Sequence, residues 1–252
     1  MNHPMRDAVT KVPAVTLGFW IIKILATTLG ETGGDAVSMS MELGYLIGTG
    51  IFAVIFLAAV AAQIRARAFH PFLYWTTIVA STTVGTTMAD YATRSLGIGY
   101  TGGSALLLGL LLACLFTWHR VMGSVDIRTV SSPRTEAFYW LTIMFSQTLG
   151  TALGDWTADT AGLGYLGGAA IFSGLLLLVL LAYGSKRFST TLLFWCAFVL
   201  TRPLGAVVGD YLDKPVSHGG LELSRYLASA MLAGAIVLLV WLLPQRAADK
   251  AH

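Results

Sequence analysis

The chain has 252 residues, of which 56% are hydrophobic and 12% charged, with a formal net charge of +3 and a mean hydropathy of +0.71. An ordinary soluble domain carries about 25% charged residues, so this chain cannot cover a water-facing surface. The composition excludes a soluble enzyme, a disordered tail and a nucleic-acid-binding module, and no nucleic-acid partner is expected. At about 20 apolar residues per membrane span, the length allows about eight transmembrane helices.

Each quarter of the chain contains two apolar runs, and each run predicts one membrane-spanning helix. In chain order, the expected spans are 14–37, 43–63, 71–92, 98–118, 137–158, 163–183, 188–211 and 225–243. The first run is too long for a signal-peptide core and lacks a cleavage pattern, so it is expected to stay in the mature protein. The polar segment 119–136 is interpreted as the join between two halves.

One pattern, W-x9-G-x3-[GA]-D, occurs four times, and each time an aromatic residue precedes the tryptophan. The aromatic pairs are Phe19-Trp20, Tyr74-Trp75, Tyr139-Trp140 and Phe194-Trp195. The glycines and aspartates are Gly30 and Asp35, Gly85 and Asp90, Gly150 and Asp155, and Gly205 and Asp210. Such self-similarity indicates one supersecondary unit used repeatedly.

The predicted fold class is all-α: a polytopic membrane protein whose eight transmembrane helices form four tandem parallel two-helix repeats. The whole chain, 1–252, is expected to be a single membrane domain, with repeats at about 12–68, 69–122, 134–187 and 188–246. Because each repeat crosses twice, all four enter the membrane in the same direction. A pseudo-fourfold or double pseudo-twofold ring is their natural packing.

Basic residues are divided unevenly between the two sides of the predicted membrane. Eleven lie on the side of the termini: Arg6, Lys11, Arg65, Arg67, Arg120, Arg128, Arg134, Lys186, Arg187, Arg246 and Lys250. The opposite loops hold only Arg94, Lys214 and Arg225. This asymmetry predicts that both termini are cytoplasmic.

Polar side chains within the spans share one helix face. Residues at 7, 11 and 15 positions after each tryptophan are four apart, so they lie on the same side of an α-helix. The resulting stripes are Thr27-Glu31-Asp35, Thr82-Thr86-Asp90, Gln147-Thr151-Asp155 and Arg202-Ala206-Asp210. With Lys23, the spans contain five acids and two bases, a net charge of −3 that calls for cations or protons. Charged residues at such depth are functional candidates.

The same residues also have structural explanations. Glycines in a G-x3-[GA] pattern allow close helix packing, which would also bring the stripes together. The aspartates either bind a cation, cap the following helix, or pair with Arg94, Lys214 or a neighbouring repeat. Arg202 is either a counter-ion for Glu31 or an aspartate, or a tethered cation that gates the site. Lys23 is expected to reach the cytoplasmic edge, and the tryptophans to form an interfacial belt.

The ligand chemistry follows from the residue types in the stripes. Carboxylate, hydroxyl and amide oxygens suit manganese, magnesium, calcium or protons, whereas zinc and copper favour thiolate and imidazole. The candidate metal ligands are Glu31, Asp35, Asp90, Asp155 and Asp210. Gln147 and Thr27 are expected to add neutral ligands, and Arg202 to tune occupancy. No covalently bound cofactor is expected, and a divalent metal ion is the expected substrate.

These observations favour a transporter of a hard divalent cation such as manganese, coupled to protons if both compete for the same carboxylates. One alternative is a passive cation channel with a ring of aspartates at its outer mouth. Another is a structural or accessory membrane protein whose stripes only hold helices together. No nucleophile–base pair is visible, so an enzyme is not expected. The expected partners are the lipid bilayer and a small cation or protons, and homo-oligomerisation is left open.

The fourfold pattern and the segment from Lys11 to Asp35 resemble a family of bacterial integral membrane proteins with four tandem two-helix repeats, a characteristic tryptophan and no known function. The resemblance covers nearly the whole chain. It implies an inner-membrane location and the four-unit architecture, and it brings little chemistry. A Gly-Tyr pair follows each of the first three aspartates, and its loss in the fourth unit departs from strict fourfold equivalence.

Overall fold

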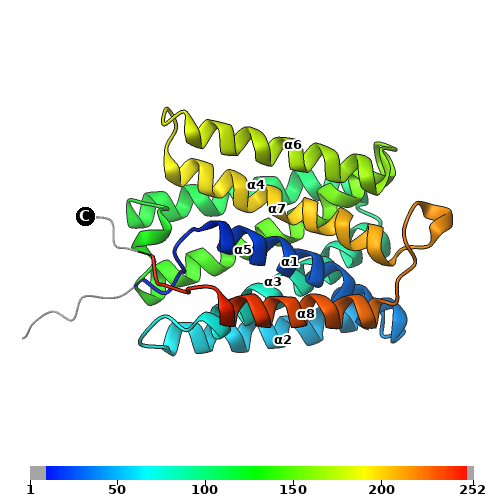
Figure 1. Cartoon of the computed structure of the whole chain (residues 1–252), viewed down its shortest axis with the longest axis horizontal. Helices are drawn as coiled ribbons and strands as arrows, with labels where there is room; N and C mark the ends of the chain where they lie inside the picture. The colour runs from blue at the N-terminus through cyan, green and yellow to red at the C-terminus, as the bar shows by residue number, and fades with distance from the viewer. Residues whose placement is uncertain (1–9, 249–252) are drawn as a thin grey trace, which may run out of the picture.

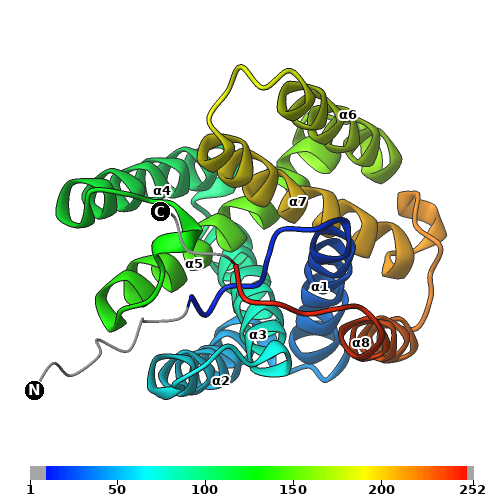
Figure 2. The ribbon, with the colours of Figure 1, turned by 60° about the vertical axis from the view of Figure 1, so that its left-hand side comes forward.

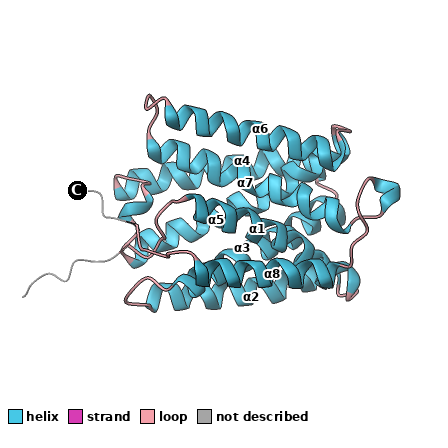
Figure 3. Ribbon diagram, viewed as in Figure 1, coloured by secondary structure: helices cyan, strands magenta, loops and turns pink. Residues whose placement is uncertain are grey.

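The computed structural model describes residues 10–248, which form eight α-helices joined by short connections at the two ends of the bundle (Figures 1 and 3). The helices are α1 Leu17–Asp35, α2 Gly44–Arg65, α3 Pro71–Asp90, α4 Gly99–Met122, α5 Pro133–Asp155, α6 Gly164–Gly184, α7 Thr190–Asp213 and α8 Arg225–Leu242. The all-α prediction is confirmed, since the only β pairing in this part of the chain is an isolated bridge between Pro13 and Ala247.

The helix limits lie close to the predicted spans, with one larger difference in the segment 119–136. There α4 continues to Met122 and α5 already begins at Pro133, so the polar join is shorter than predicted. Ser132 caps α5 by accepting a 3.2 Å hydrogen bond from the Thr135 backbone N–H. Proline is favourable in the first turn of a helix, because the missing N–H has no intrahelical partner there.

The odd-numbered helices form a closed inner ring, and the even-numbered helices cover it from outside (Figure 2). Around the ring, α1 packs against α3, α3 against α5, α5 against α7, and α7 against α1. The second helix of each repeat covers the first helix of the next one: α2 packs on α3, α4 on α5, and α6 on α7. The same rule brings α8 back onto α1 and closes the ring.

The two ends of the described chain meet at one end of the ring. The Ala14 N–H donates to the Arg246 carbonyl, and the Ala248 N–H donates to the Val12 carbonyl, both at 2.8 Å. We call this the terminus end and the opposite one the aspartate end. The basic residues Arg6 and Lys250 lie outside the described residues.

The glycines of the repeated pattern lie where neighbouring inner helices approach most closely. At each of them, a Cβ atom would overlap the first stripe residue of the neighbouring repeat. The contacts are Gly30 with Thr82, Gly85 with Gln147, Gly150 with Arg202, and Gly205 with Thr27. The small residues therefore create the space that the stripes occupy, as the sequence pattern suggested.

Three of the four repeat tryptophans are buried inside the ring and Trp20 is partly exposed, so the prediction of an interfacial belt is wrong for three of the four. Trp75, Trp140 and Trp195 are 2%, 4% and 5% exposed. In each repeat, the aromatic residue before the tryptophan packs on the tryptophan of the neighbouring repeat. The pairs are Phe19–Trp75, Tyr74–Trp140, Tyr139–Trp195 and Phe194–Trp20, with ring centroids 5.4, 5.7, 6.2 and 5.9 Å apart. These eight residues form an aromatic plug at the terminus end.

Five helices are long and apolar enough to cross a membrane: α2, α4, α6, α7 and α8. In the four outer helices, only 11–17% of the most apolar 18-residue stretch is buried, so the apolar side chains point away from the ring. The inner helices α1, α3 and α5 have similar lengths but are less apolar, and they are not among these five. Their buried faces carry many threonines and charged residues, which line the interior of the ring.

The substitution Gly85→Ala tests the close approach of inner helices. Its Cβ would lie 2.9 Å from the Gln147 Cβ and 3.0 Å from the Gln147 carbonyl carbon, so α3 and α5 must separate. We expect a loss of about 1 to 3 kcal/mol in the free energy of unfolding. The matched control is Gly109→Ala in α4, where a Cβ meets nothing within 4 Å. Equal melting temperatures of the two purified variants would contradict the prediction.

Candidate functional site

The stripe residues form three successive layers in the interior of the ring. From the terminus end, the first layer is Thr27, Thr82, Gln147 and Arg202; the second is Glu31, Thr86, Thr151 and Ala206; the third is Asp35, Asp90, Asp155 and Asp210. All twelve side chains belong to residues that are at most 3% exposed. The structure therefore places every predicted site residue in one common interior rather than in four separate clefts.

The guanidinium of Arg202 connects all four inner helices. Its Nη2 lies 2.9 Å from Glu31 Oε2 on α1 and 2.6 Å from Thr86 Oγ1 on α3, and it also donates to Thr151 Oγ1 on α5. Both members of the ion pair are buried, with side chains 0% and 3% exposed. Arg202 is thus a counter-ion of Glu31, one of the two roles that the sequence left open.

Room for Glu31 is provided by another glycine of the repeated pattern. A Cβ at Gly209 of α7 would lie 2.6 Å from the Glu31 Cβ. At the equivalent place, Gly34 of α1 lies against Thr86 of α3. Where the second small residue of the pattern is glycine, it therefore makes room for a residue of the second layer, as the first glycine does for the first layer.

The aspartates of α3 and α5 share one arginine. Arg94 Nε lies 2.9 Å from Asp90 Oδ1, and Arg94 Nη2 lies 3.5 Å from Asp155 Oδ2. Arg94 follows α3 in a π-helical turn, Tyr91–Ser95, which begins directly after Asp90. Arg94 is therefore bound to the third layer, as one of the alternatives left open by the sequence suggested.

The aspartates of α1 and α7 share one lysine. Lys214 Nζ is paired with Asp35 Oδ2 and lies 3.1 Å from Asp210 Oδ1. Arg225 Nε lies 3.9 Å from Asp35 Oδ2 and 3.1 Å from Asp213 Oδ2. Pairing with basic residues is therefore the structural role that the aspartates have.

The alternative role in helix capping is not seen for the first three aspartates. The following helices α2, α4 and α6 have Leu43, Ile98 and Leu163 as their N-cap residues, and none of these helices has a side-chain capping bond. The pairing also changes the charge balance, because the bases Arg94, Lys214 and Arg225 join the interior together with one further acid, Asp213. The predicted interior charge of −3 is too negative for the assembled site.

Three of the five predicted metal ligands come together. Glu31, Asp35 and Asp210 each place one carboxylate oxygen within 4.8 Å of the others, and all three residues are buried. We call them the carboxylate cluster. Within residues 10–248, no other group of three or more potential metal ligands converges in this way. Asp90 and Asp155 do not belong to the cluster, since they lie beside Arg94.

The predicted neutral ligands lie one or two layers away from the cluster. Thr27 Oγ1 donates to the carbonyls of Ile24 at 2.8 Å and Thr201 at 3.2 Å, so its hydrogen is used by the backbone. Gln147 Nε2 lies 3.4 Å from Ser81 Oγ, while Gln147 Oε1 has no hydrogen-bond partner among the described residues. Thr86 is closer to the carboxylates, because its hydroxyl lies 3.3 Å from Glu31 Oε2.

The prediction that Lys23 reaches the cytoplasmic edge is wrong. Lys23 is 0% exposed, and its Nζ lies 4.2 Å from the centroid of the Phe198 ring. Among the described residues, Nζ has no hydrogen-bond partner. The aromatic plug, which includes Phe19 and Trp20 of the same helix, lies on the terminus side of this amine.

Sequence reasoning named Arg94 and Lys214 as possible partners of the aspartates, but it did not include them, Asp213 or Arg225 among the site residues. A local signal was present, because Arg94 follows Asp90 by four residues and Lys214 follows Asp210 by four residues. An acid four residues before a base on a helix favours an ion pair. Asp213 and Arg225 had no comparable signal, since the turn that brings them together depends on the whole connection between α7 and α8.

Comparison with known proteins gives one match. The family model described as Repeat of Unknown Function (DUF347) matches the chain four times, at residues 18–69, 73–124, 138–188 and 193–247. Four tandem repeats are therefore confirmed, and together they span most of the chain. No curated protein and no solved structure matches the chain.

The Arg202–Glu31 pair can be tested with a double-mutant cycle. Arg202→Met keeps the aliphatic part of the side chain but leaves the Glu31 carboxylate buried without its counter-ion, and we expect a loss of about 3 to 5 kcal/mol. Glu31→Gln alone should also destabilise the protein, while the double variant should regain much of the loss. The measurement is the free energy of unfolding of the purified protein.

Arg120→Met is the control for loss of an arginine, because Arg120 is exposed on α4. It should leave the stability nearly unchanged. Additive losses from Arg202→Met and Glu31→Gln would show that the two buried groups do not depend on each other.

Proposed function

Since the chain belongs to this family, whose description names no activity, we propose from the site itself that the protein is a multi-pass membrane transporter of a small hard cation. The outward-facing apolar surfaces of α2, α4, α6 and α8 support membrane insertion. In this proposal the three polar helices α1, α3 and α5 also span the bilayer, shielded from lipid by the outer helices. Enclosing polar side chains in this way is the arrangement that hydrocarbon demands.

The proposed orientation has the terminus end in the cytoplasm of a bacterial cell, with the protein in the inner membrane. Basic residues support this orientation. Arg65, Arg67, Arg120 and Arg187 lie in or beside connections at the terminus end and are exposed or partly exposed. At the aspartate end, Arg94, Lys214 and Arg225 are engaged with carboxylates, so they add little positive charge to that surface.

The observation that carries the proposal is the carboxylate cluster of Glu31, Asp35 and Asp210. Three carboxylate oxygens in one buried place favour a hard cation, and manganese is the first candidate among manganese, magnesium and calcium. Arg202 and Lys214 bind carboxylates of the same cluster, so a bound cation must compete with them. Protons compete for carboxylates as well, which provides a physical basis for proton coupling.

A carrier is favoured over a passive channel because side chains occupy both ends of the ring. The aromatic plug fills the terminus end, and the ion pairs of the third layer occupy the aspartate end. A carrier opens these two ends alternately. A structural or accessory role is the second candidate, because every stripe aspartate is paired with a basic residue. An enzymatic role forms no part of the proposal.

Thermal unfolding with added divalent salts tests the proposal. A ligand that binds only the folded state stabilises it by about 2.7 kcal/mol at a concentration of 100 Kd. We expect Mn²⁺ to raise the melting temperature of the native protein, and this rise to be lost in Asp35→Asn. Asp159→Asn is the matched control, because Asp159 is an exposed acid on the turn after α5 at the same end of the ring.

Transport is then measured with proteoliposomes that contain a Mn²⁺-sensitive dye. The native protein and Asp159→Asn should move the ion, and Asp35→Asn should not. Unitary currents in a planar bilayer would instead identify a channel. If no divalent cation protects the protein and none is moved, the accessory role is favoured.

A further inference from the structure

The connection between α7 and α8 differs from the other connections at the aspartate end. In the first three repeats, a glycine in the left-handed region begins the second helix, with φ of 75°, 74° and 65° at Gly44, Gly99 and Gly164. In the fourth repeat, the chain instead folds back along the end of α7. The N–H groups of Leu221, Glu222 and Leu223 donate to the carbonyls of Tyr211, Lys214 and Leu212 at 2.7, 2.9 and 2.9 Å.

This fold-back holds the backbone of Lys214 in place. Gly220 lies so close that a Cβ atom there would overlap the Lys214 carbonyl group. The side chain of Lys214 runs toward the interior and is only 12% exposed. Its ammonium is paired with Asp35, lies 3.1 Å from Asp210 Oδ1, and lies 4.0 Å from Asp213 Oδ1. One amine therefore occupies a position surrounded by three carboxylates.

The carboxylates have more acceptor capacity than Lys214 uses. Asp35 Oδ1 and Asp213 Oδ1 are buried and have no hydrogen-bond partner among the described residues. Asp35 itself is 0% exposed. A buried carboxylate oxygen without a donor is unfavourable, so the site is suited to a ligand that brings further positive charge or further donors.

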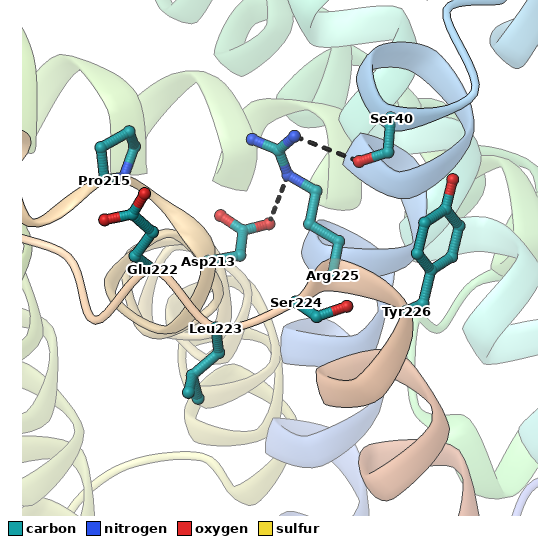
Figure 4. A pocket seen from close by; sticks show the side chains of 8 residues that line it. All are labelled: Ser40, Asp213, Pro215, Glu222, Leu223, Ser224, Arg225 and Tyr226. Atoms are coloured by element: carbon teal, nitrogen blue, oxygen red, sulfur yellow. Dashed lines mark hydrogen bonds and ion pairs between the residues drawn. The ribbon is translucent and has the colours of Figure 1, made fainter.

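A surface cavity of about 310 Å³ lies next to this place, with Asp213 in its wall (Figure 4). Asp213 and Arg225 line it together with Ser40 and Glu222. Arg225 donates to Asp213 Oδ2 at 3.1 Å and to Ser40 Oγ at 3.2 Å, so its guanidinium spans the cavity wall. Arg225 Nε also lies 3.9 Å from Asp35 Oδ2, so Arg225 connects the wall of the cavity to the carboxylate of Asp35.

We propose that the place between Asp35 and Asp210 is a binding position for a small cation that arrives through this cavity, and that the Lys214 ammonium fills it as a tethered substitute. An arriving cation displaces the ammonium, whose side chain turns into the cavity, and Arg225 moves aside with it. When the cation leaves, Lys214 returns and neutralises the carboxylates. The role of this exchange in transport rests on the proposed function. Binding at this position can be measured separately, because it changes the melting temperature without any transport.

Replacement of the tethered amine by a free one is the direct test. Lys214→Ala removes the ammonium and leaves its space, so the variant should have a lower melting temperature than the native protein. Addition of n-propylammonium chloride should restore the melting temperature in a saturable way. Equal concentrations of n-propanol, which lacks the charge, and of sodium chloride, which supplies ionic strength and a cation without N–H donors, should restore less.

Arg187→Ala, an exposed residue at the terminus end, is the control variant and should not respond to n-propylammonium. Lys214→Gln keeps most of the side-chain volume and removes only the charge, so it serves where Lys214→Ala does not fold. In Lys214→Gln, we expect Mn²⁺ to protect at a concentration about tenfold lower than in the native protein, because the competing amine is gone.

The results separate the two proposals. If neither n-propylammonium nor Mn²⁺ protects the Lys214 variants more than sodium chloride does, the binding position is wrong. If Mn²⁺ moves through the native protein in that case, the proposed function still stands. Saturable protection by n-propylammonium without any flux would support the binding position and contradict transport.

Discussion

The close approach of neighbouring inner helices is the constraint on which the rest of the structure depends. Stripe residues lie directly against the backbone of the adjacent helix, because that helix has a glycine without a side chain at the contact. These glycines are Gly30, Gly85, Gly150 and Gly205. The same spacing, repeated four times, closes α1, α3, α5 and α7 into one ring. The polar stripes then have a common interior and are removed from the apolar outer surface.

This enclosure makes the charges depend on one another. Removing ions from water costs several kcal/mol for each, and only good pairing and further hydrogen bonds offset that cost. Arg202 Nη2 pairs with Glu31 and donates to the hydroxyls of Thr86 and Thr151, so a single side chain connects α7 to the other three inner helices. Its Nε and Nη1 have no hydrogen-bond partner among the described residues. Lys23 is different, because it is equally buried and has no acid beside it among its described contacts.

The repeats are equivalent in packing but not in chemistry. Glu31 and Lys23 occur only in the first repeat, whereas Arg202, Lys214 and Arg225 belong to the fourth. These two repeats are farthest apart in the sequence, yet ring closure places α1 directly beside α7 and α8. The fourfold scaffold therefore concentrates its unusual residues at one junction, where the carboxylate cluster and the cavity also lie.

Much of this arrangement was predictable from residue types and spacing alone. The eight helices, the four repeats, the shared face of each stripe and the candidate partners Arg94 and Lys214 all follow from local regularities, since helical periodicity relates residues a few positions apart. Those regularities do not say which way a stripe faces or which helices become neighbours. The burial of Lys23 and of three of the four repeat tryptophans, the choice of Glu31, Asp35 and Asp210 as the converging carboxylates, and the inward path of Lys214 were decided only by tertiary structure, because each depends on contacts between helices that ring closure brings together.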